Sequence, residues 1–245
     1  MLSSVRNVAR VLKSFRLDRP EMSLSELSRN LDIPKSTMFK LLHTMLAEGF
    51  LERNAQTGKY RPGRRMQSMS HVILSNSELT QESIPHLRYL AKHTGMVAHL
   101  TSYEHGDVVW LTKIQEFCQL QVYSRVGRRV PAYAPASGRA ILAHLDSEEV
   151  TELMNREWRA LTPKTHTDKE SFMAELEHIK ASGFSIQCEE VDLGVTSVGV
   201  AILDASSRPV AGISVAGYST SFDERTTQHA YLALKQTAQE IANYM

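Results

Sequence analysis

The first 65 residues contain three short segments in which apolar residues recur at helical spacing. In the first segment these positions are Val5, Val8, Val11, Leu12 and Phe15. The second segment begins at Ser23, and Glu26 three residues later completes a capping-box pattern. The third runs from Pro34 to Glu48 and carries its apolar stripe at Met38, Leu41, Leu42, Met45 and Leu46. These spacings predict three short helices around a small shared core.

Only Asp32 and Ile33 separate the second and third predicted helices, which indicates a helix-turn-helix. Pro34 is expected at the first position of the third helix, where its missing N–H is tolerated. Residues 50–53 are then predicted as a short strand, residues 54–58 as a turn and residues 59–62 as a returning strand. The pattern is typical of a winged helix-turn-helix, a DNA-reading unit.

The exposed side of the third predicted helix carries the candidate DNA-binding residues Lys35, Ser36, Thr37, Lys40 and His43. A helix that enters the major groove needs short polar and cationic residues near its amino-terminal end. Phe39 is expected either to touch a thymine methyl or to pack inside the domain. On the outgoing strand of the hairpin, Lys59 and Arg61 form a basic arm that is also predicted to contact DNA.

Charge divides the chain at the same place. Residues 1–65 hold 13 Lys and Arg against 6 Asp and Glu, whereas the remainder holds 15 against 21. The chain's net charge of +1 therefore conceals a basic part of +7 and an acidic part of −6. A basic small domain suits attraction to phosphates. The alternative is a structural three-helix domain with a solvated basic face.

The rest of the 245-residue chain mixes helical and alternating patterns. A connecting helix is predicted over residues 64–77, with Met66, Met69 and Ile73 on one side, and a second helix from Pro85 to just before Gly95. Strands are predicted at 97–103, 108–114, 120–124, 184–188, 195–203 and 209–217. Further helices are predicted from Ser137, near 147–158, at 168–181 after a capping box at 167–170, and at 223–244. The fold class is therefore α+β, with an antiparallel sheet and helices outside it.

Several function classes lack support in the sequence. No apolar run approaches the ~20 residues of a membrane span, and the amino-terminal segment does not have the pattern of a secretory signal, so a cytoplasmic protein without membrane association is expected. Cys118 and Cys188 are interpreted as buried, reduced residues. The scattered histidines predict no metal site, and no cofactor is predicted. Because neither a nucleophile elbow nor a glycine-rich phosphate loop occurs, the protein is not expected to be an enzyme.

Over nearly its full length the chain resembles the IclR-type (isocitrate lyase regulator type) transcription factors. The N-terminal part carries the resemblance in residues 33–37 (Ile-Pro-Lys-Ser-Thr) and 46–49 (Leu-Ala-Glu-Gly), and the C-terminal part carries it in residues 124–131, 136–142, 189–194, 200–204 and 210–215. The resemblance implies a GAF-like effector-binding domain, a homodimer or dimer of dimers, and operators read by paired winged helices. Residues 123–131 look closest to the regulators of sugar-acid catabolism, the 2-keto-3-deoxygluconate subgroup.

The resemblance also implies an effector site lined by Ala136, Ser137, Gln187, Val195, Ser197 and Ser214. The predicted helix start at Ala136 would offer unpaired amides to a small carboxylate. Relatives often carry an acidic or cysteine residue where this chain has Gln187 and Ser197, and Ala216 replaces a frequent serine, so one wall is expected to be less polar. Glu189 and Glu190 do not suggest acid-base catalysis, because adjacent residues of a strand point to opposite faces.

These observations predict a winged helix-turn-helix domain in residues 1–65, a linker helix in 66–79 and a GAF-like effector-binding domain in 80–245. The predicted function is a ligand-responsive transcriptional regulator, a repressor of catabolic genes. Its partners would be double-stranded operator DNA and a small keto or hydroxy acid. The alternative is a dimeric small-molecule-binding interaction module without sequence-specific DNA binding.

Overall fold

The computed structural model describes residues 2–16, 18–75, 77–120, 122 and 124–244. The chain divides into two compact units, Met1–Ser77 and Glu78–Met245, each with a hydrophobic core of its own. Among the described residues, no helix combines the length and the apolar character that a membrane crossing requires.

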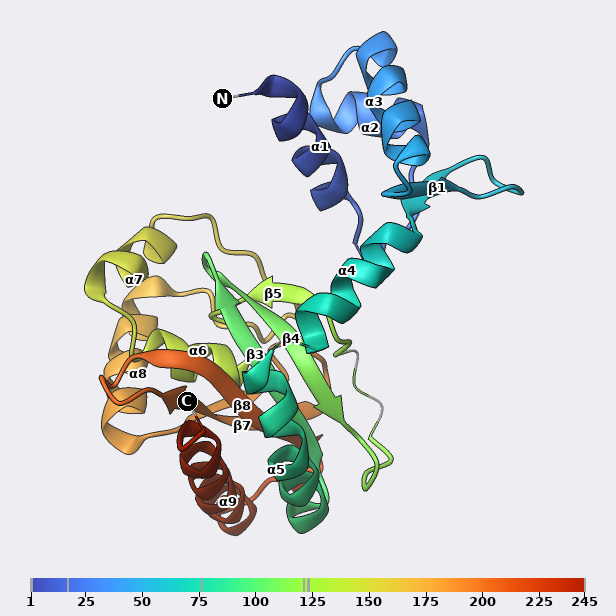
Figure 1. The fold of residues 1–245 in the computed structure, drawn as a ribbon. Helices are drawn as coiled ribbons and strands as arrows, with labels where there is room; N and C mark the ends of the chain where they lie inside the picture. Colours follow the sequence, from blue (N-terminus) through green and yellow to red (C-terminus); the bar gives the residue numbers. More distant parts are fainter. Residues whose placement is uncertain (1, 17, 76, 121, 123, 245) are drawn as a thin grey trace. The chain divides into compact units, whose positions relative to one another are not determined.

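The N-terminal unit is a helix-turn-helix followed by a hairpin and a further helix (Figure 1). The antiparallel hairpin is extended by the backbone of Met22, which pairs with that of Tyr60. Its elements in chain order are α1 (Ser3–Ser14), α2 (Leu24–Leu31), α3 (Lys35–Ala47), β1 (Leu51–Arg53), β2 (Tyr60–Pro62) and α4 (Arg64–Ser75). The predicted winged helix-turn-helix is thereby confirmed.

A single cluster of side chains holds this unit together. Its buried members come from every element before α4, and the least exposed of them are Val11, Met22, Leu27, Met38, Leu42, Met45 and Leu51. Two predictions about this region are wrong. Val5 is 62% exposed, since the first helix turns this position to solvent. Pro34 precedes α3 as its N-cap residue, because its extended ψ of 140° leaves only its carbonyl, which accepts the Met38 N–H, inside the helix.

The C-terminal unit is built on one antiparallel sheet with the strand order β5-β4-β3-β8-β7-β6. The strands are β3 (Val97–Glu104), β4 (Asp107–Ile114), β5 (Arg129–Pro131), β6 (Ser185–Cys188), β7 (Val195–Leu203) and β8 (Pro209–Tyr218). The helices are α5 (Glu78–Thr94), α6 (Ala136–Leu142), α7 (Ser147–Met154), α8 (Lys169–Ser182) and α9 (Glu224–Ala242), with a short 3-10 turn at Ser219–Ser221. The α+β fold class is confirmed.

The two faces of the sheet have different coverings (Figure 1). Helices α5 and α9 pack on one face, where Leu87 and Leu234 meet the inward residues Val198, Val200 and Ile213. Helix α6 packs on the other face and contacts β7 and β8, and α8 packs outside α6. Alternate residues of β7 therefore face two different environments, as the two-residue period of a strand requires.

Two glycines allow α6 to lie directly against the sheet. A Cβ at Gly199 of β7 would lie 2.5 Å from the backbone nitrogen of Ser137 and 2.6 Å from the carbonyl carbon of Ala136. A Cβ at Gly212 of β8 would lie 2.8 Å from the carbonyl oxygen of Ser137. Any side chain at these positions would push the helix away. The start of α6 is thus fixed by strand residues far away in the sequence.

Helix α5 begins seven residues earlier than predicted, and Pro85 lies inside it. The residues ahead of Pro85 pack well: Thr80 and Ser83 are buried, and Leu79 contacts the core. This packing outweighs the backbone hydrogen bond that a proline removes from a helix interior.

Three other predictions in the C-terminal unit are wrong. The described residues Leu120, Val122 and Ser124 lie outside any strand, because the strand that pairs with β4 and forms the edge of the sheet is β5. The capping box at 167–170 does not form, since the Asp168 carboxylate accepts the N–H groups of Glu170 and Ser171 and is the cap. Cys188 is exposed, because it ends the edge strand β6 on its outward side; Cys118 is half-buried.

Candidate functional site

The exposed face of α3 carries the predicted DNA-binding residues. Met38, Leu42 and Met45 are buried in the core and fix the opposite face of the helix. The side chains left exposed at its amino-terminal end and along its outer face are those of Lys35, Ser36, Thr37, Phe39, Lys40 and His43. The structure therefore brings these six residues onto one surface of the unit.

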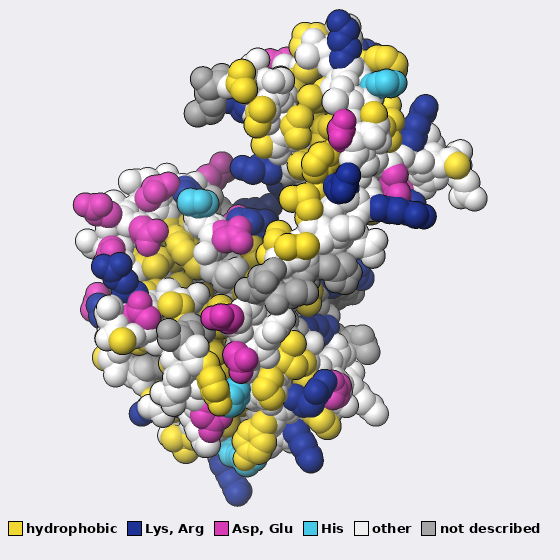
Figure 2. All heavy atoms as spheres, in the orientation of Figure 1, with side chains coloured by type: hydrophobic (Ala, Val, Ile, Leu, Met, Phe, Trp, Pro, Cys, Tyr) yellow, Lys and Arg dark blue, Asp and Glu magenta, His cyan; other side chains and the backbone are white. Residues whose placement is uncertain are grey.

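Phe39 is 57% exposed, which excludes the predicted alternative of packing inside the domain. Its ring centroid lies 6.2 Å from that of His43, one helical turn along the same face. Figure 2 shows separate Lys and Arg side chains over the visible surface of this unit, with hydrophobic side chains between them. Exposed apolar and cationic groups side by side suit base edges and phosphates, respectively.

Hydrogen bonds hold α2 and α3 in a fixed relation. The Ser23 hydroxyl accepts the Glu26 N–H and the Glu26 carboxylate accepts the Ser23 N–H, so the predicted capping box is present. These bonds from Ser23, followed by one from Arg19, hold the pKa of Glu26 at about 2. The Ser28 hydroxyl donates to the Ile33 carbonyl over 2.6 Å across the turn. The orientation of α3 relative to α2 is thus fixed by bonds within the unit itself.

The hairpin presents its two predicted basic residues differently. Arg61 is exposed, but its guanidinium already bonds Glu52 at 2.5 Å and lies 3.5 Å from Glu21. Lys59 is half-buried beside the turn. A DNA contact by Arg61 would therefore have to replace or share an existing ion pair.

The predicted effector residues come from four elements but share one side of the sheet. Gly199 faces α6, so Ser197 and Val195, two and four residues before it in the same strand, face α6 too. Ser214 pairs with Gly199 and Gln187 pairs with Ser197, and side chains of directly paired residues lie on the same face. None of the six residues is more than 7% exposed. The structure thus brings the strand residues onto the face that Ala136 and Ser137 of α6 cover.

Polar side chains on this face have hydrogen-bonding capacity to spare. The Gln187 amide nitrogen donates to the Ser197 hydroxyl over 2.9 Å, and the Gln187 amide oxygen accepts the Glu190 N–H over 2.8 Å. The Ser137 hydroxyl is 1% exposed and has no hydrogen-bond partner within the described part of the chain. A buried unpaired hydroxyl is costly, and a ligand atom would relieve that cost.

His99 belongs to the same face, although no motif or spacing in the sequence singles it out. It pairs with Ser214 across the strands, and its Nε2 lies 2.7 Å from the Ser124 hydroxyl. Complete burial, reinforced by the positive charge of Lys113, lowers the pKa of His99 to about 3. The imidazole is therefore neutral at physiological pH. Only the pairing register reveals this neighbour of Ser214.

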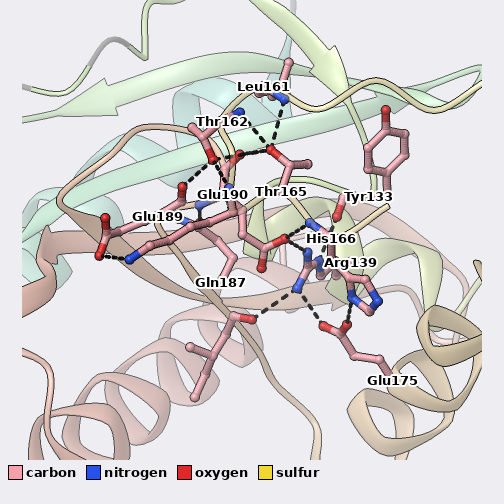
Figure 3. A network of polar contacts seen from close by, with 12 residues as sticks. Tyr133, Arg139, Leu161, Thr162, Thr165, His166, Glu175, Gln187, Glu189 and Glu190 are labelled. Carbon is pink, nitrogen blue, oxygen red and sulfur yellow. Dashed lines mark hydrogen bonds and ion pairs between the residues drawn. The ribbon is translucent and has the colours of Figure 1, made fainter. Parts of the chain in front are cut away.

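A buried ion-pair network lies next to the effector residues (Figure 3). Arg139 of α6 is 2% exposed and pairs with two carboxylates, those of Glu175 at 2.7 Å and Glu190. The Glu190 carboxylate also accepts the His166 N–H at 2.7 Å, and the Thr165 hydroxyl donates to the Glu190 carbonyl at 2.7 Å. This network ties α6 to α8 and to the turn after β6.

Glu189 and Glu190 do not lie in a strand, so the strand argument about their directions is wrong. Strand β6 ends at Cys188, and Glu189 has a φ of +60°, which turns the chain away from the sheet. Glu189 instead pairs with Lys164 at 2.8 Å, and this bond lowers the pKa of the carboxyl group. Both carboxylates are occupied by cations and hold the fold together.

The other face of the C-terminal unit has a surface pocket of about 190 Å³ between α5 and α9. Its lining includes Tyr89, His93 and His229, and the rings of the two histidines have centroids 4.9 Å apart. In the described residues, no three His, Cys, Asp or Glu side chains are grouped so that they could hold a metal ion.

A helix-turn-helix with a hairpin, joined in one chain to an α+β unit with unused buried hydroxyls, defines a two-domain transcriptional regulator. Two family models match the sequence: the IclR helix-turn-helix domain over residues 4–55 and the bacterial transcriptional regulator IclR C-terminal domain over residues 71–243. The chain belongs to the IclR family of bacterial transcriptional regulators, which confirms the resemblance.

Similar proteins cover nearly the whole chain. The transcriptional regulator KdgR of Escherichia coli K12 is 29% identical over 97% of this chain and 90% of its own length, and XynR of the same strain is 28% identical over 91% and 89%. An IclR regulator from Alicyclobacillus acidocaldarius has the same fold, with a TM-score of 0.88, 23% identity and coverage of 100% and 99%. An IclR homologue from Microbacterium hydrocarbonoxydans, solved with 4-hydroxybenzoate, gives a TM-score of 0.83 at 26% identity over 99% and 98%.

The substitution Arg139→Met should lower the free energy of unfolding by about 3–5 kcal/mol, because it leaves the buried Glu190 carboxylate without its cation. Urea denaturation of the intact protein measures this change. The matched control is Arg88→Met, whose exposed pair with Glu116 should contribute less than about 1 kcal/mol. Equal effects of the two substitutions would contradict the role given to the network.

Proposed function

We propose that this protein represses catabolic genes by binding operator DNA through its N-terminal unit and is controlled by a small organic acid held in its C-terminal unit. The buried, unpartnered Ser137 hydroxyl on the face shared with Ser197 and Ser214 carries the effector half of this proposal. The exposed face of α3 carries the DNA half. Since its target is chromosomal DNA, the protein acts in the cytoplasm.

The similar proteins support a small acid as effector without naming one. The Microbacterium homologue was solved with 4-hydroxybenzoate, a carboxylic acid, and another relative, AllR of Escherichia coli K12, is named a transcriptional repressor. KdgR and XynR are almost equally identical to this chain. We infer a keto or hydroxy acid, with the sugar-acid regulators as the first group to test.

For the DNA contacts we propose Lys35, Ser36, Thr37, Phe39, Lys40 and His43, with Lys59 and Arg61 on the hairpin. Lys35 and Lys40 suit phosphates, because a lysine on an exposed helix side reaches the backbone on either side of a groove. Ser36, Thr37 and His43 suit base edges, and the exposed Phe39 ring suits a thymine methyl. For the effector we propose Ala136, Ser137, Gln187, Val195, Ser197 and Ser214.

A regulator is favoured over a catalyst because the acidic side chains next to the proposed effector residues are already engaged in ion pairs. The carboxylates of Glu189 and Glu190 are paired with Lys164 and Arg139, respectively.

The alternative function is an interaction module that binds a small molecule but no specific DNA. Such a module would have no use for the cationic and apolar face of α3, and a gel-shift with promoter DNA at several salt concentrations separates the two functions.

Replacing Lys35 or Lys40 by Ala should weaken binding to all DNA sequences to a similar extent. Each lost phosphate contact should reduce the slope of log affinity against log salt concentration by about 0.9. Fluorescence anisotropy with a duplex selected from random-sequence DNA measures both quantities. Lys180→Ala, on α8 of the other unit, is the control with the same change in charge. Unchanged affinity and slope in both α3 variants would exclude α3 as the DNA-reading helix.

We further propose that α4 pairs two copies of the chain, since paired half-sites are what one small winged domain needs for specificity. Met69, Val72 and Ile73 lie on one side of this helix and are 46%, 62% and 65% exposed. Light scattering of the intact protein at micromolar concentration should give at least twice the mass of one chain. Ile73→Asp should lower that mass, and Gln67→Asp on the opposite side of α4 should not. A parent protein that is strictly monomeric would disprove this assembly.

The substitution Ser137→Ala should weaken effector binding about tenfold while leaving the free energy of unfolding unchanged or higher. The reason is that the hydroxyl has no partner to lose within the fold, whereas one hydrogen bond to the charged carboxylate of the ligand is worth about 1.5 kcal/mol, which corresponds to roughly tenfold in affinity. Calorimetry with a panel of keto, hydroxy and aromatic acids measures the affinity. Ser83→Ala, another buried unpartnered hydroxyl on α5, is the control and should bind as the parent does. Equal affinities in the parent and Ser137→Ala would place the effector elsewhere.

A further inference from the structure

The hydrogen bonds around Gln187 have only one possible direction. The backbone N–H of Glu190 can only donate, so the atom of Gln187 that lies 2.8 Å from it must be the amide oxygen. The other end of the amide is then the NH₂ group, which lies 2.9 Å from the Ser197 hydroxyl and must donate to it. The side chain is 3% exposed, so water does not offer an easy alternative.

The donor role of the Gln187 amide nitrogen determines which hydrogen bond the Ser197 hydroxyl can make next. Because the Ser197 oxygen accepts from Gln187, the proton of the same hydroxyl needs an acceptor of its own. Within the described residues, the Ser197 hydroxyl accepts a hydrogen bond from Gln187 but donates none. Ser197 is 7% exposed and lies on the sheet face that α6 covers, and α6 itself carries the unpartnered hydroxyl of Ser137. This face therefore has at least one hydroxyl proton to donate and a second hydroxyl that is free to donate.

The ion-pair network around Arg139 holds Glu190, and therefore the hydrogen bonds of Gln187, in place. The N–H of Glu190 fixes Gln187, and Glu190 is itself held by three bonds (Figure 3). Its carboxylate accepts from Arg139 and from the backbone N–H of His166. Its carbonyl accepts from the Thr165 hydroxyl. A rotation of the Gln187 amide would place its NH₂ group against the Glu190 N–H. Two donors facing each other in a buried site would be strongly unfavourable. The network thus prevents the direction from reversing.

We propose that Gln187 is a specificity-determining residue of the effector site: it turns the Ser197 hydroxyl into a donor and thereby selects ligands that present only acceptors, as a carboxylate does, over neutral amides of the same shape. This inference rests on the proposed function, because it concerns the same site. Gln187 acts through Ser197, so its effect is on the choice between ligands and not on the presence of the site.

The test compares Gln187→Glu with the parent in the intact protein. A carboxylate at this position still accepts the Glu190 N–H, but it also accepts the Ser197 proton and adds a negative charge near the ligand. Calorimetry uses matched pairs of probes: pyruvate with pyruvamide, lactate with lactamide, and 4-hydroxybenzoate with 4-hydroxybenzamide. We expect the parent to prefer the acid of at least one pair, and Gln187→Glu to lower that preference at least tenfold.

The variant Gln187→Met fills the same volume without polarity and should give a preference between those of the parent and Gln187→Glu. If Gln187→Glu does not fold, the order of the parent and Gln187→Met decides the question. An acid preference that is equal in the parent and in whichever variants fold overturns the role of Gln187 and leaves the proposed function intact. If the parent binds no acid of the panel, the proposed effector class is wrong, and the inference is overturned with it.

Discussion

The direct contact between the start of α6 and the middle of the sheet is the constraint on which the C-terminal unit depends. Gly199 and Gly212 have no side chains, so the backbone of Ala136 and Ser137 lies where a Cβ would otherwise be. This close approach buries the Ser137 hydroxyl against the sheet face that also carries Ser197 and Ser214. It also directs Arg139, one turn further along α6, toward the carboxylates of Glu175 and Glu190. The candidate effector site and the ion-pair network are therefore two consequences of one packing contact.

The two halves of the chain achieve rigidity by different means. In the N-terminal unit, local signals fix the position of α3: a capping box at Ser23, a hydroxyl-to-carbonyl bond across the turn and one apolar stripe on α3. In the C-terminal unit, the hydrogen-bond directions around Gln187 are fixed by a buried charge network that spans several elements. A buried network of this kind is valuable only if every member is satisfied, because low polarity raises the cost of an unpaired group. The Ser137 hydroxyl is one of the few buried polar atoms of the described residues without a partner, and among the proposed effector residues it is the one in that state.

The sequence predicted those features that depend on neighbours within a few positions. The helix-turn-helix, the hairpin, most strands and the faces of α3 follow from periodicity, capping and turn residues. The six proposed effector residues came from the family resemblance, and the structure shows that they share one face of the sheet. The sequence did not predict the Arg139 network, because Arg139 meets carboxylates 36 and 51 positions away. His99 was missed for the same reason, since only the strand register places it beside Ser214. The error at Glu189 arose because one residue with positive φ ends β6 sooner than alternation suggests.

Hydrogen exchange of the intact protein, with and without a carboxylic acid that binds it, tests most directly whether the effector occupies the α6 face of the sheet. The structure predicts that bound acid slows exchange at the backbone amides of residues 136–142 and of β7 around Ser197, where the ligand would fix the helix against the strand. Slower exchange confined to α5 and α9, around the pocket lined by Tyr89 and His93, would contradict the account and place the effector on the opposite face.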